Sequence, residues 1–348
     1  MPQTDSSPCP IGIIVNPVSG RDVRRLAARA GTSTPEDKRN QVQRIIVGAA
    51  AAGAEQVVLV SDPFRIADSA VEALGVDIDV QMLDLTTRCH PRDTPASVEA
   101  MRERGCRVLV VLGGDGTNRQ IAKSWPDAPL VSISTGTNNV FPSRVEATMA
   151  GAAAGLVASG RVPLEAVSHR AKVVRNAIDG EPDDLALIDA VHLVEDSTGN
   201  RLPYEPAKIR RIVVSRAEPC AVGISPIAGL LHPTTEADDR GVAVACGEAG
   251  GPLLVPISPG LYTELGVIDS RELKLGERVE LTGPGLLAFD GDRERNLAEG
   301  QAASLWVERS GPWVIDVPAT LREAAQRGSY REGRPWRDHR GSASSTCC

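Results

Sequence analysis

The sequence predicts a protein of two domains, a parallel α/β domain followed by a domain rich in β-strands. The chain has 348 residues, which fits two domains better than one at roughly 150 residues per domain. Hydrophobic residues make up 42% of the chain, which is enough to form sizeable cores. Up to about residue 142, apolar strand-like runs alternate with helical patterns, whereas short β-like runs separated by turn residues follow from residue 171.

The first domain opens with a short apolar strand at 11–17 that ends in a turn. A helix is expected from Thr34 to about Gly53, because Thr34 can cap it and Pro35 suits the first helical position. The next elements are strand 55–60, helix 63–75, strand 79–85, a helix at 94–105 opening on Thr94 or Ser97, and strands 107–114 and 128–134. Two of these strands are continuously apolar, which predicts a parallel sheet covered by helices on both faces.

The rest of the chain begins with an Ala/Gly-rich helix at 146–160, in which the spacing of Gly151 and Gly155 suits close helix packing. The β-like runs that follow predict a mostly antiparallel domain. Segment 313–328 is expected to form a strand and helix that return to the first domain. We therefore expect an α/β domain at 11–143, a β-rich domain at 144–312, the returning segment 313–328, and a polar disordered tail at 329–348.

Composition and charge exclude several classes of protein. Aromatic residues make up 3% of the chain and the net charge is −7, which argue against a nucleic-acid partner. The seven scattered cysteines contain no Cys-x-x-Cys pair, so reduced thiols are expected rather than disulfides or a zinc site. The amino terminus does not resemble a signal peptide and no apolar run is long enough to cross a membrane. We expect a cytoplasmic protein with a small-molecule substrate and no membrane partner, and a homo-oligomer stays open.

Polar, glycine-containing loops follow three of the predicted parallel strands, at 16–20 ("NPVSG"), 113–117 ("GGDGT") and 134–139 ("STGTNN"). Ligands collect beyond the carboxyl ends of strands in open parallel sheets. Glycine lets the backbone approach a phosphate, and a following helix N-terminus favours negative charge. The hydroxyls of Ser19, Thr117 and Thr137 can add hydrogen bonds to phosphate oxygens. The first and third loops alone could equally be structural turns.

Asp115 is the unusual member of these loops, because an acid repels phosphate unless it binds a metal or accepts a proton. Phosphoryl transfer offers both roles, since a carboxylate can orient the attacking hydroxyl and take its proton, or hold Mg²⁺. We expect Asp115 to have an ordinary pKa and to be ionised at pH 7. An acid between glycines directly after a buried strand has little structural purpose.

The motifs at 16–20, 113–117 and 136–139, in this order, resemble the superfamily that joins NAD kinases with diacylglycerol and sphingoid-base kinases. The resemblance covers roughly residues 11 to 325, and segment 134–158 most resembles the ATP–NAD kinase-like branch called acetoin catabolism protein X. It implies an NAD-kinase-like fold, ATP with Mg²⁺, and Asp115 as the base for the acceptor hydroxyl. The residues implied to bind the nucleotide phosphates are Asn16, Ser19, Gly20, Gly113, Gly114, Gly116, Thr117, Thr137, Asn138 and Asn139.

The chain departs from its relatives at three places. Asn139 stands where the lipid kinases have an acid, so the third loop offers less to a metal. Ile188 replaces the asparagine of an NAD-binding pair, whereas Asp189 keeps the acid. Asp290 and Asp292 flank Gly291 where the lipid kinases have Asp-Gly-Glu, so both are candidate accessory residues, although Asp-Gly is also typical of a hairpin turn.

The leading hypothesis is an ATP-dependent kinase that phosphorylates a hydroxyl of NAD or a related nucleotide. Two alternatives stay open. One is a kinase of a lipid or small metabolite, which the first and third loops favour. The other is a non-catalytic nucleotide-binding regulator, which would explain the change at Ile188 but not the intact "GGDGT".

Overall fold

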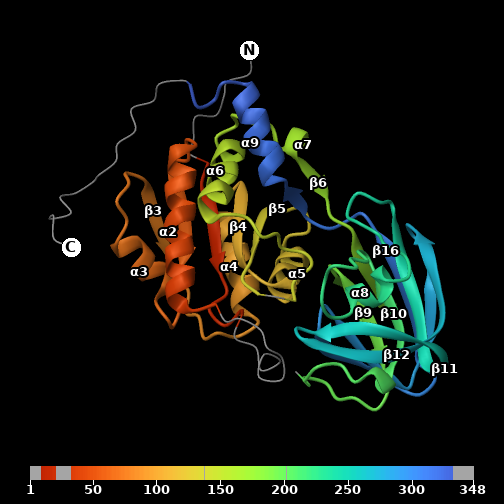
Figure 1. The fold of residues 1–348 in the computed structure, drawn as a ribbon. Coiled ribbons are helices and arrows are strands. Elements are labelled where there is room, and N and C mark those ends of the chain that lie inside the picture. The colour runs from red at the N-terminus through yellow and green to blue at the C-terminus, as the bar shows by residue number, and fades with distance from the viewer. Residues whose placement is uncertain (1–8, 21–32, 137, 201, 332–348) are drawn as a thin grey trace.

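The structure is a computed structural model that describes residues 9–20, 33–136, 138–200 and 202–331. Thr137 and the tail from residue 332 onward lie outside the described residues. Figure 1 shows two parts side by side, an α/β part and a β-rich part. The predicted fold class, an N-terminal parallel α/β domain with a C-terminal β-rich domain, is confirmed.

A seven-stranded sheet forms the centre of the α/β part, in the order β3-β2-β1-β4-β5-β17-β6. All neighbours in it are parallel except β17 and β6. The bounds of its strands are Ile11–Val15 (β1), Gln56–Val60 (β2), Asp79–Leu83 (β3), Val108–Gly113 (β4), Pro129–Ser134 (β5), Ser168–Arg170 (β6) and Trp313–Ile315 (β17). Every residue of β4 is buried, as its continuous apolar run predicts for a central parallel strand.

Helices cover both faces of this sheet (Figure 1). One face packs against α2 (Pro35–Ala51), α3 (Ile66–Glu72) and α6 (Ala147–Ala158), and the other against α4 (Asp93–Glu103) and α5 (Asp115–Ser124). The side chain of Thr34 caps α2, as the sequence predicts, and Asp37 completes a capping box. The prediction that a helix opens on Thr94 or Ser97 was wrong, because α4 begins earlier, at Asp93. The Asp93 carboxylate accepts the backbone N–H groups of Arg88 and His90.

The two glycines of α6 allow the close packing that their spacing predicts. A Cβ atom on Gly151 would lie 2.0 Å from the carbonyl oxygen of Ile45 in α2, and one on Gly155 would lie 2.6 Å from that of Ala49. Gly48 of α2 makes the reciprocal approach to the Thr148 carbonyl at 2.0 Å. The two helix backbones therefore approach at a distance that only glycine permits at these positions.

The β-rich part contains two sheets that enclose a shared core. One is six-stranded in the order β12-β11-β10-β9-β14-β15, and the other is four-stranded in the order β13-β16-β7-β8. Their bounds are Val173–Ile178 (β7), Asp184–Ala186 (β8), Asp189–Leu193 (β9), Ile209–Val214 (β10), Arg240–Ser258 (β11), Leu261–Lys274 (β12), Val279–Thr282 (β13), Gly285–Phe289 (β14), Asp292–Leu297 (β15) and Ala302–Glu308 (β16). The short helices are Leu164–Val167 (α7), Pro206–Lys208 (η1) and Ser225–Gly229 (α8), and α8 covers the outer face of the six-stranded sheet.

The chain returns to the α/β part after β16. Strand β17 pairs in parallel with β5, and α9 (Val317–Gln326) packs against α6. Ser329 is buried in a turn that follows α9, so the described chain is ordered for a few residues past the expected end of the returning segment. A strand from the far end of the sequence thus lies inside the sheet of the α/β part, between β5 and β6.

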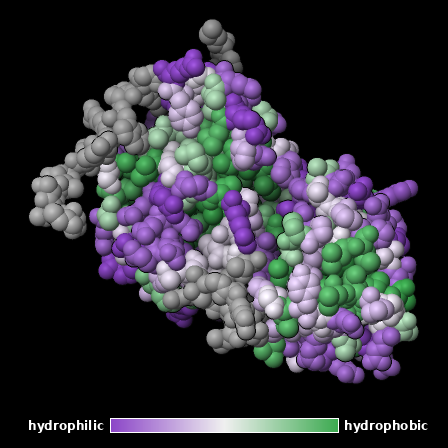
Figure 2. All heavy atoms as spheres, viewed as in Figure 1, coloured by the Kyte–Doolittle hydropathy of each residue, from purple (hydrophilic) through white to green (hydrophobic). Residues whose placement is uncertain are grey.

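Strands β11 and β12 are much longer than the short run that the sequence suggests. They pair antiparallel over most of their length, with an irregularity between Cys246 and Gly251. Figure 2 shows a hydrophobic patch on the β-rich part, and the exposed large apolar residues of this hairpin are Leu254, Leu261, Tyr262 and Ile268. Within the described residues, no helix is long and apolar enough to cross a membrane.

Candidate functional site

A cavity of about 720 Å³ lies beyond the carboxyl ends of the parallel strands, where the α/β part meets the β-rich part. Strand order reverses between β1 and β4, and this is the position at which doubly wound sheets bind nucleotides. The cavity collects most of the predicted site residues, namely Asn16, Ser19, Gly20, Gly114, Asp115, Gly116, Thr117, Asn138, Asn139, Asp290 and Asp292. Gly113 and Asp189 are not among its lining residues.

The first loop is held in place by the side chain of Asn16. Its amide nitrogen donates to the Thr117 hydroxyl at 2.8 Å, which ties the first loop to the second. Its amide oxygen accepts the backbone N–H groups of Val18 and Ser19. The Ser19 hydroxyl lies 2.8 Å from that of Thr135, so the third loop is joined to the first as well. Three loops that are distant in the sequence therefore form one connected wall.

Lys38 holds the first loop through its backbone carbonyl groups. The sequence did not predict this residue. Its side chain is fully buried, and its ammonium group donates to the carbonyl oxygens of Asn16, Pro17 and Ser19 at 2.7–2.9 Å. An ammonium has three donors, and three carbonyls of one loop receive them. The sequence holds no local signal for this role, because the contacts join Lys38 to carbonyl groups 19–22 positions earlier in the chain.

The glycines of "GGDGT" are explained by side chains that approach them rather than by unusual backbone angles. A Cβ atom on Gly113 would meet the Thr117 side chain at 2.7 Å, and one on Gly114 would meet Asn139 Oδ1 at 2.8 Å. A Cβ atom on Gly116 would lie 3.3 Å from Asp292 Oδ2. The second loop is thereby packed against its own helix, the third loop and the β-rich part.

Asp115 is the first residue of α5 and is partly buried on the cavity wall. Its carboxylate accepts backbone N–H bonds from Val140 at 3.1 and 3.2 Å and from Phe141 at 2.9 Å. Burial raises the pKa of Asp115 to about 7, and the charge of Asp290 adds to the rise against those hydrogen bonds. The expectation of an ordinary pKa was therefore wrong, because the sequence does not reveal burial or the second acid.

Asp290 has a structural role that its motif leaves open. It occupies the turn between β14 and β15 with φ of 49°, so the hairpin interpretation of Asp-Gly is correct. Its carboxylate also accepts the backbone N–H groups of Leu187, Ile188 and Asp189 at 2.7–3.2 Å. Burial raises the pKa of Asp290, and Arg119 and those N–H groups oppose the rise. Asp290 thus fixes the corner between β8 and β9 while facing the same cavity as Asp115.

The two other acidic candidates differ in position. Asp292 lines the cavity beside the first turn of α5. Asp189 is buried in β9 outside the cavity, next to the fully buried Ile188. The structure therefore brings Asp115, Asp290 and Asp292 together and leaves Asp189 out of the cavity lining.

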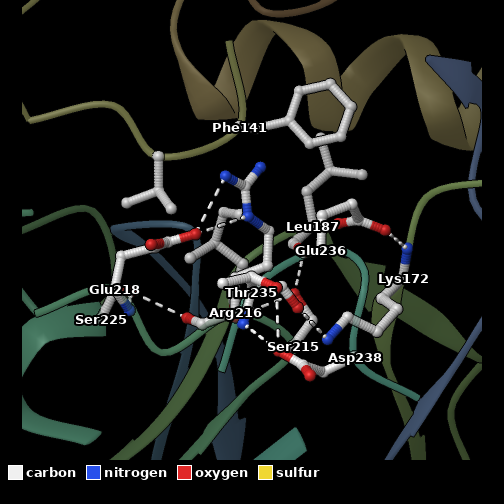
Figure 3. Close-up of polar contacts among 12 residues, drawn as sticks. Phe141, Lys172, Leu187, Ser215, Arg216, Glu218, Ser225, Thr235, Glu236 and Asp238 are labelled. Carbon is white, nitrogen blue, oxygen red and sulfur yellow. Dashed lines mark hydrogen bonds and ion pairs between the residues drawn. The ribbon is translucent and has the colours of Figure 1, made fainter. Parts of the chain in front are cut away.

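Arg216 is a further cation near the site that the sequence analysis did not identify. It follows β10, and its guanidinium lies 3.2 Å from the Glu218 carboxylate. Figure 3 shows this guanidinium extending from the β-rich part toward Phe141, with Glu218 beside it and the Lys172–Glu236 contacts on the other side. Its positive charge opposes the rise in the pKa of Asp115.

The cavity is acidic within the part of the chain that the structure describes. Five aspartates line it, Asp62, Asp93, Asp115, Asp290 and Asp292, and no lysine or arginine does. No group of three or more His, Cys, Asp or Glu side chains among the described residues has a geometry that holds a metal ion. A cation could still enter with phosphate oxygens, because Mg²⁺ in nucleotide sites needs only one or two protein carboxylates.

The fold of this chain is that of the NAD kinases, and comparison with known proteins agrees. The family model of the ATP-NAD kinase N-terminal domain matches residues 11–162. The crystal structure of yeast NADH kinase complexed with NADH has the same fold, with a TM-score of 0.52 at 14% identity over 94% of this chain and 89% of that one. The fold and the family match support a function of the nucleotide-kinase type.

The sequence relatives narrow the class to one family. The family model of the acetoin catabolism protein X C-terminal domain matches residues 172–310. Acetoin catabolism protein X of Cupriavidus necator is 33% identical over 337 residues, which is 92% of this chain and 94% of that protein. An Archaeoglobus fulgidus protein is 30% identical over 134 residues, 38% of this chain and 36% of its own length. The chain belongs to the acetoin catabolism protein X family.

Proposed function

We propose that this protein is an ATP-dependent phosphotransferase that acts on a hydroxyl group of NAD or a related nucleotide, with Asp115 as the general base. The observation that carries the proposal is the convergence of the loops after β1, β4 and β5 on one cavity, with Asp115 at the N-terminus of α5. Backbone N–H groups and a helix N-terminus suit the phosphates of ATP.

In the proposed reaction the acceptor oxygen bonds to the γ-phosphorus and the bond from that phosphorus to ADP breaks. The proton of the acceptor hydroxyl passes to the carboxylate of Asp115. A base is most effective when its pKa is near the working pH, and a pKa of about 7 meets that condition. Asn16, Ser19, Gly114, Gly116 and Thr117 would face the phosphates, and Mg²⁺ would balance the charge of an acidic cavity.

The choice of acceptor rests on the ATP-NAD kinase match over the first domain. Asp290 and Asp292, which the β-rich part contributes, would lie on the acceptor side of the cavity. Because Asp189 lies outside the cavity lining, it would not hold the dinucleotide.

One observation favours a second candidate, a nucleotide-binding regulator without transfer activity. Both oxygens of Asp115 accept N–H bonds from the third loop, so this acid could serve to order the loop alone. In that case Asp115→Asn would alter nucleotide affinity, and no transfer would occur in any variant.

The test incubates purified protein with Mg²⁺, ATP and NAD and follows NADP with an NADP-specific dehydrogenase, while calorimetry measures ATP binding. We expect NADP from the wild type, and Asp115→Asn to bind ATP but to lose transfer by about 10²-fold or more. Transfer retained in Asp115→Asn would overturn the assigned role. ATP binding without NADP would move the search to lipid and small-metabolite acceptors or to a regulator.

A further inference from the structure

A buried charge cluster joins the helix that carries Asp115 to the β-rich part. Arg119 lies in α5, and its side chain has no exposed surface. Its guanidinium makes a two-point contact with the Glu294 carboxylate, at 2.8 and 3.1 Å, and lies 3.1 Å from Asp184. Its Nε donates to the carbonyl oxygen of Leu185 at 2.5 Å, and its Cζ lies 5.0 Å from the centroid of the Phe289 ring.

These partners come from three strands in two sheets, β8, β14 and β15. A two-point contact between a guanidinium and a carboxylate fixes orientation as well as distance. Lys123, one turn further along α5, contacts only the Asp184 end of the cluster, at 2.9 Å. Arg119 therefore makes the contact to β15, and Lys123 does not.

The contact between Arg119 and Glu294 aligns β15 with the first turn of α5. Asp292 and Glu294 both reach α5, and the register of β15 shifts at Glu294, between the pairs Leu287–Arg295 and Ala288–Arg293. Residues 116 and 119 lie on the same face of the helix, because they are one turn apart. Glu294 meets Arg119, and Asp292 lies beside Gly116, where a Cβ would be 3.3 Å from its carboxylate. Asp290 comes two residues before Asp292 in the chain and also lines the cavity.

We propose that Arg119 is a positioning residue for the Asp115 site: its contact with Glu294 holds β15 along α5 and so sets where Asp290 and Asp292 lie relative to Asp115. This inference rests on the proposed function, in which Asp115 is the base. The inference goes beyond the proposed function because it assigns the placement of Asp290 and Asp292 to Arg119, a residue outside the cavity lining.

The charges around Asp115 give this proposal a readout that a purely structural role would not move. Asp115 is faced by Asp290 and Arg216 from the β-rich part and by the N–H groups of Val140 and Phe141 from the third loop. The charge of Asp290 raises the pKa of Asp115, so displacing the β14–β15 turn lowers that pKa. The positive charge of Arg119 also opposes the rise in the pKa of Asp290.

The test compares Glu294→Gln with Lys123→Gln. Glu294→Gln removes the ion pair to β15 while Asp184 stays in place to pair with Arg119, so the fold should persist. Lys123→Gln removes a contact to the same cluster without touching β15 and serves as the matched control. The readouts are the rate of transfer to NAD, ATP affinity by calorimetry, and the titration midpoint of the Asp115 carboxyl by carbon-13 NMR, assigned with Asp115→Asn.

We expect Glu294→Gln to lower kcat by about tenfold or more with unchanged ATP affinity, and to lower the Asp115 midpoint by about half a pH unit or more. Lys123→Gln should leave all three unchanged, and Glu294→Asp should restore part of the loss. If the two glutamine variants behave alike, the proposal is overturned. If even the wild type transfers nothing, the proposed function fails, and the Asp115 midpoint alone decides the positioning role: a shift confined to Glu294→Gln supports it, and no shift overturns it.

Discussion

Replacing Asp115 with asparagine should stabilise the protein at alkaline pH and leave its stability unchanged at acidic pH. Burial, with the charge of Asp290, raises the pKa of Asp115 from 3.8 to about 7. Because the native pKa is above that of the unfolded chain, the native state holds the proton more tightly between these values. The free energy of unfolding therefore falls as the pH rises from about 4 to about 7, and the full cost is present above pH 7.

The size of the effect follows from this shift. A rise of about three pKa units corresponds to about 4 kcal/mol. Asp115 is partly exposed on the cavity wall, so solvent screens its charge, and we expect about 2 kcal/mol. Asparagine has nearly the shape of protonated aspartate and still offers an oxygen to the N–H groups of Val140 and Phe141. The stability difference should thus grow from about zero at pH 4 to about 2 kcal/mol at pH 8.5.

Urea unfolding of the wild type and Asp115→Asn at both pH values, followed by circular dichroism, measures this difference. Asp93→Asn is the matched control, because Asp93 lies in the same cavity and accepts N–H bonds from Arg88 and His90. The control should lose stability at both pH values. The reasoning is refuted if Asp115→Asn is less stable than the wild type at pH 8.5, or if its advantage is equal at the two pH values. A stable asparagine variant without activity would indicate that stability is given up for function at this position.

Three further predictions concern the framework around the site. Gly151→Ala should lower the free energy of unfolding by on the order of 3 kcal/mol, because the new Cβ would lie 2.0 Å from the Ile45 carbonyl oxygen. Gly251→Ala should lower it by about 0.5 kcal/mol or less, because a Cβ there would have no neighbouring atom within 4 Å. Equal losses in the two variants would contradict this reasoning. Lys38→Met should weaken ATP binding in calorimetry by about tenfold or more, because three loop carbonyls lose their donor; unchanged affinity would mean that the loop holds itself. Asn176→Leu should raise the free energy of unfolding by about 1–3 kcal/mol, because the fully buried amide of Asn176 has no hydrogen-bond partner among the described residues. A variant less stable than the wild type would indicate that the amide has a buried partner such as water.

The elements that position the site could be predicted because their signals are local. The continuous apolar run of β4, the capping residue Thr34 and the glycine spacing in α6 each depend on a few neighbouring residues. The loops after β1, β4 and β5 share one cavity because parallel strands place their carboxyl ends at one edge of the sheet. The residues of these loops that could bind phosphate were also visible in the sequence, because each loop is a short continuous motif.

The parts that sequence reasoning missed depend on contacts between distant residues. Asp290 binds the N–H of Leu187 across 103 positions, and Arg119 meets Glu294 across 175. The residues next to Asp290 in the sequence predict a turn, but they do not reveal that its carboxylate also binds the backbone between β8 and β9. The raised pKa of Asp115 has the same origin, because it depends on burial and on an acid from the other domain. The returning strand β17 was expected, but its pairing with β5 is set by tertiary contacts.

The most direct test of the central claim is the pH dependence of phosphoryl transfer from ATP to NAD in the wild type and in Asp115→Asn, at saturating Mg²⁺-ATP. If Asp115 accepts the proton of the acceptor hydroxyl, the wild-type rate rises with pH through a midpoint near the Asp115 pKa of about 7, and the asparagine variant is slower by about 10²-fold or more and lacks that rise. A variant that transfers at the wild-type rate, or that keeps the same rise with pH, would contradict the assignment of Asp115 as the base.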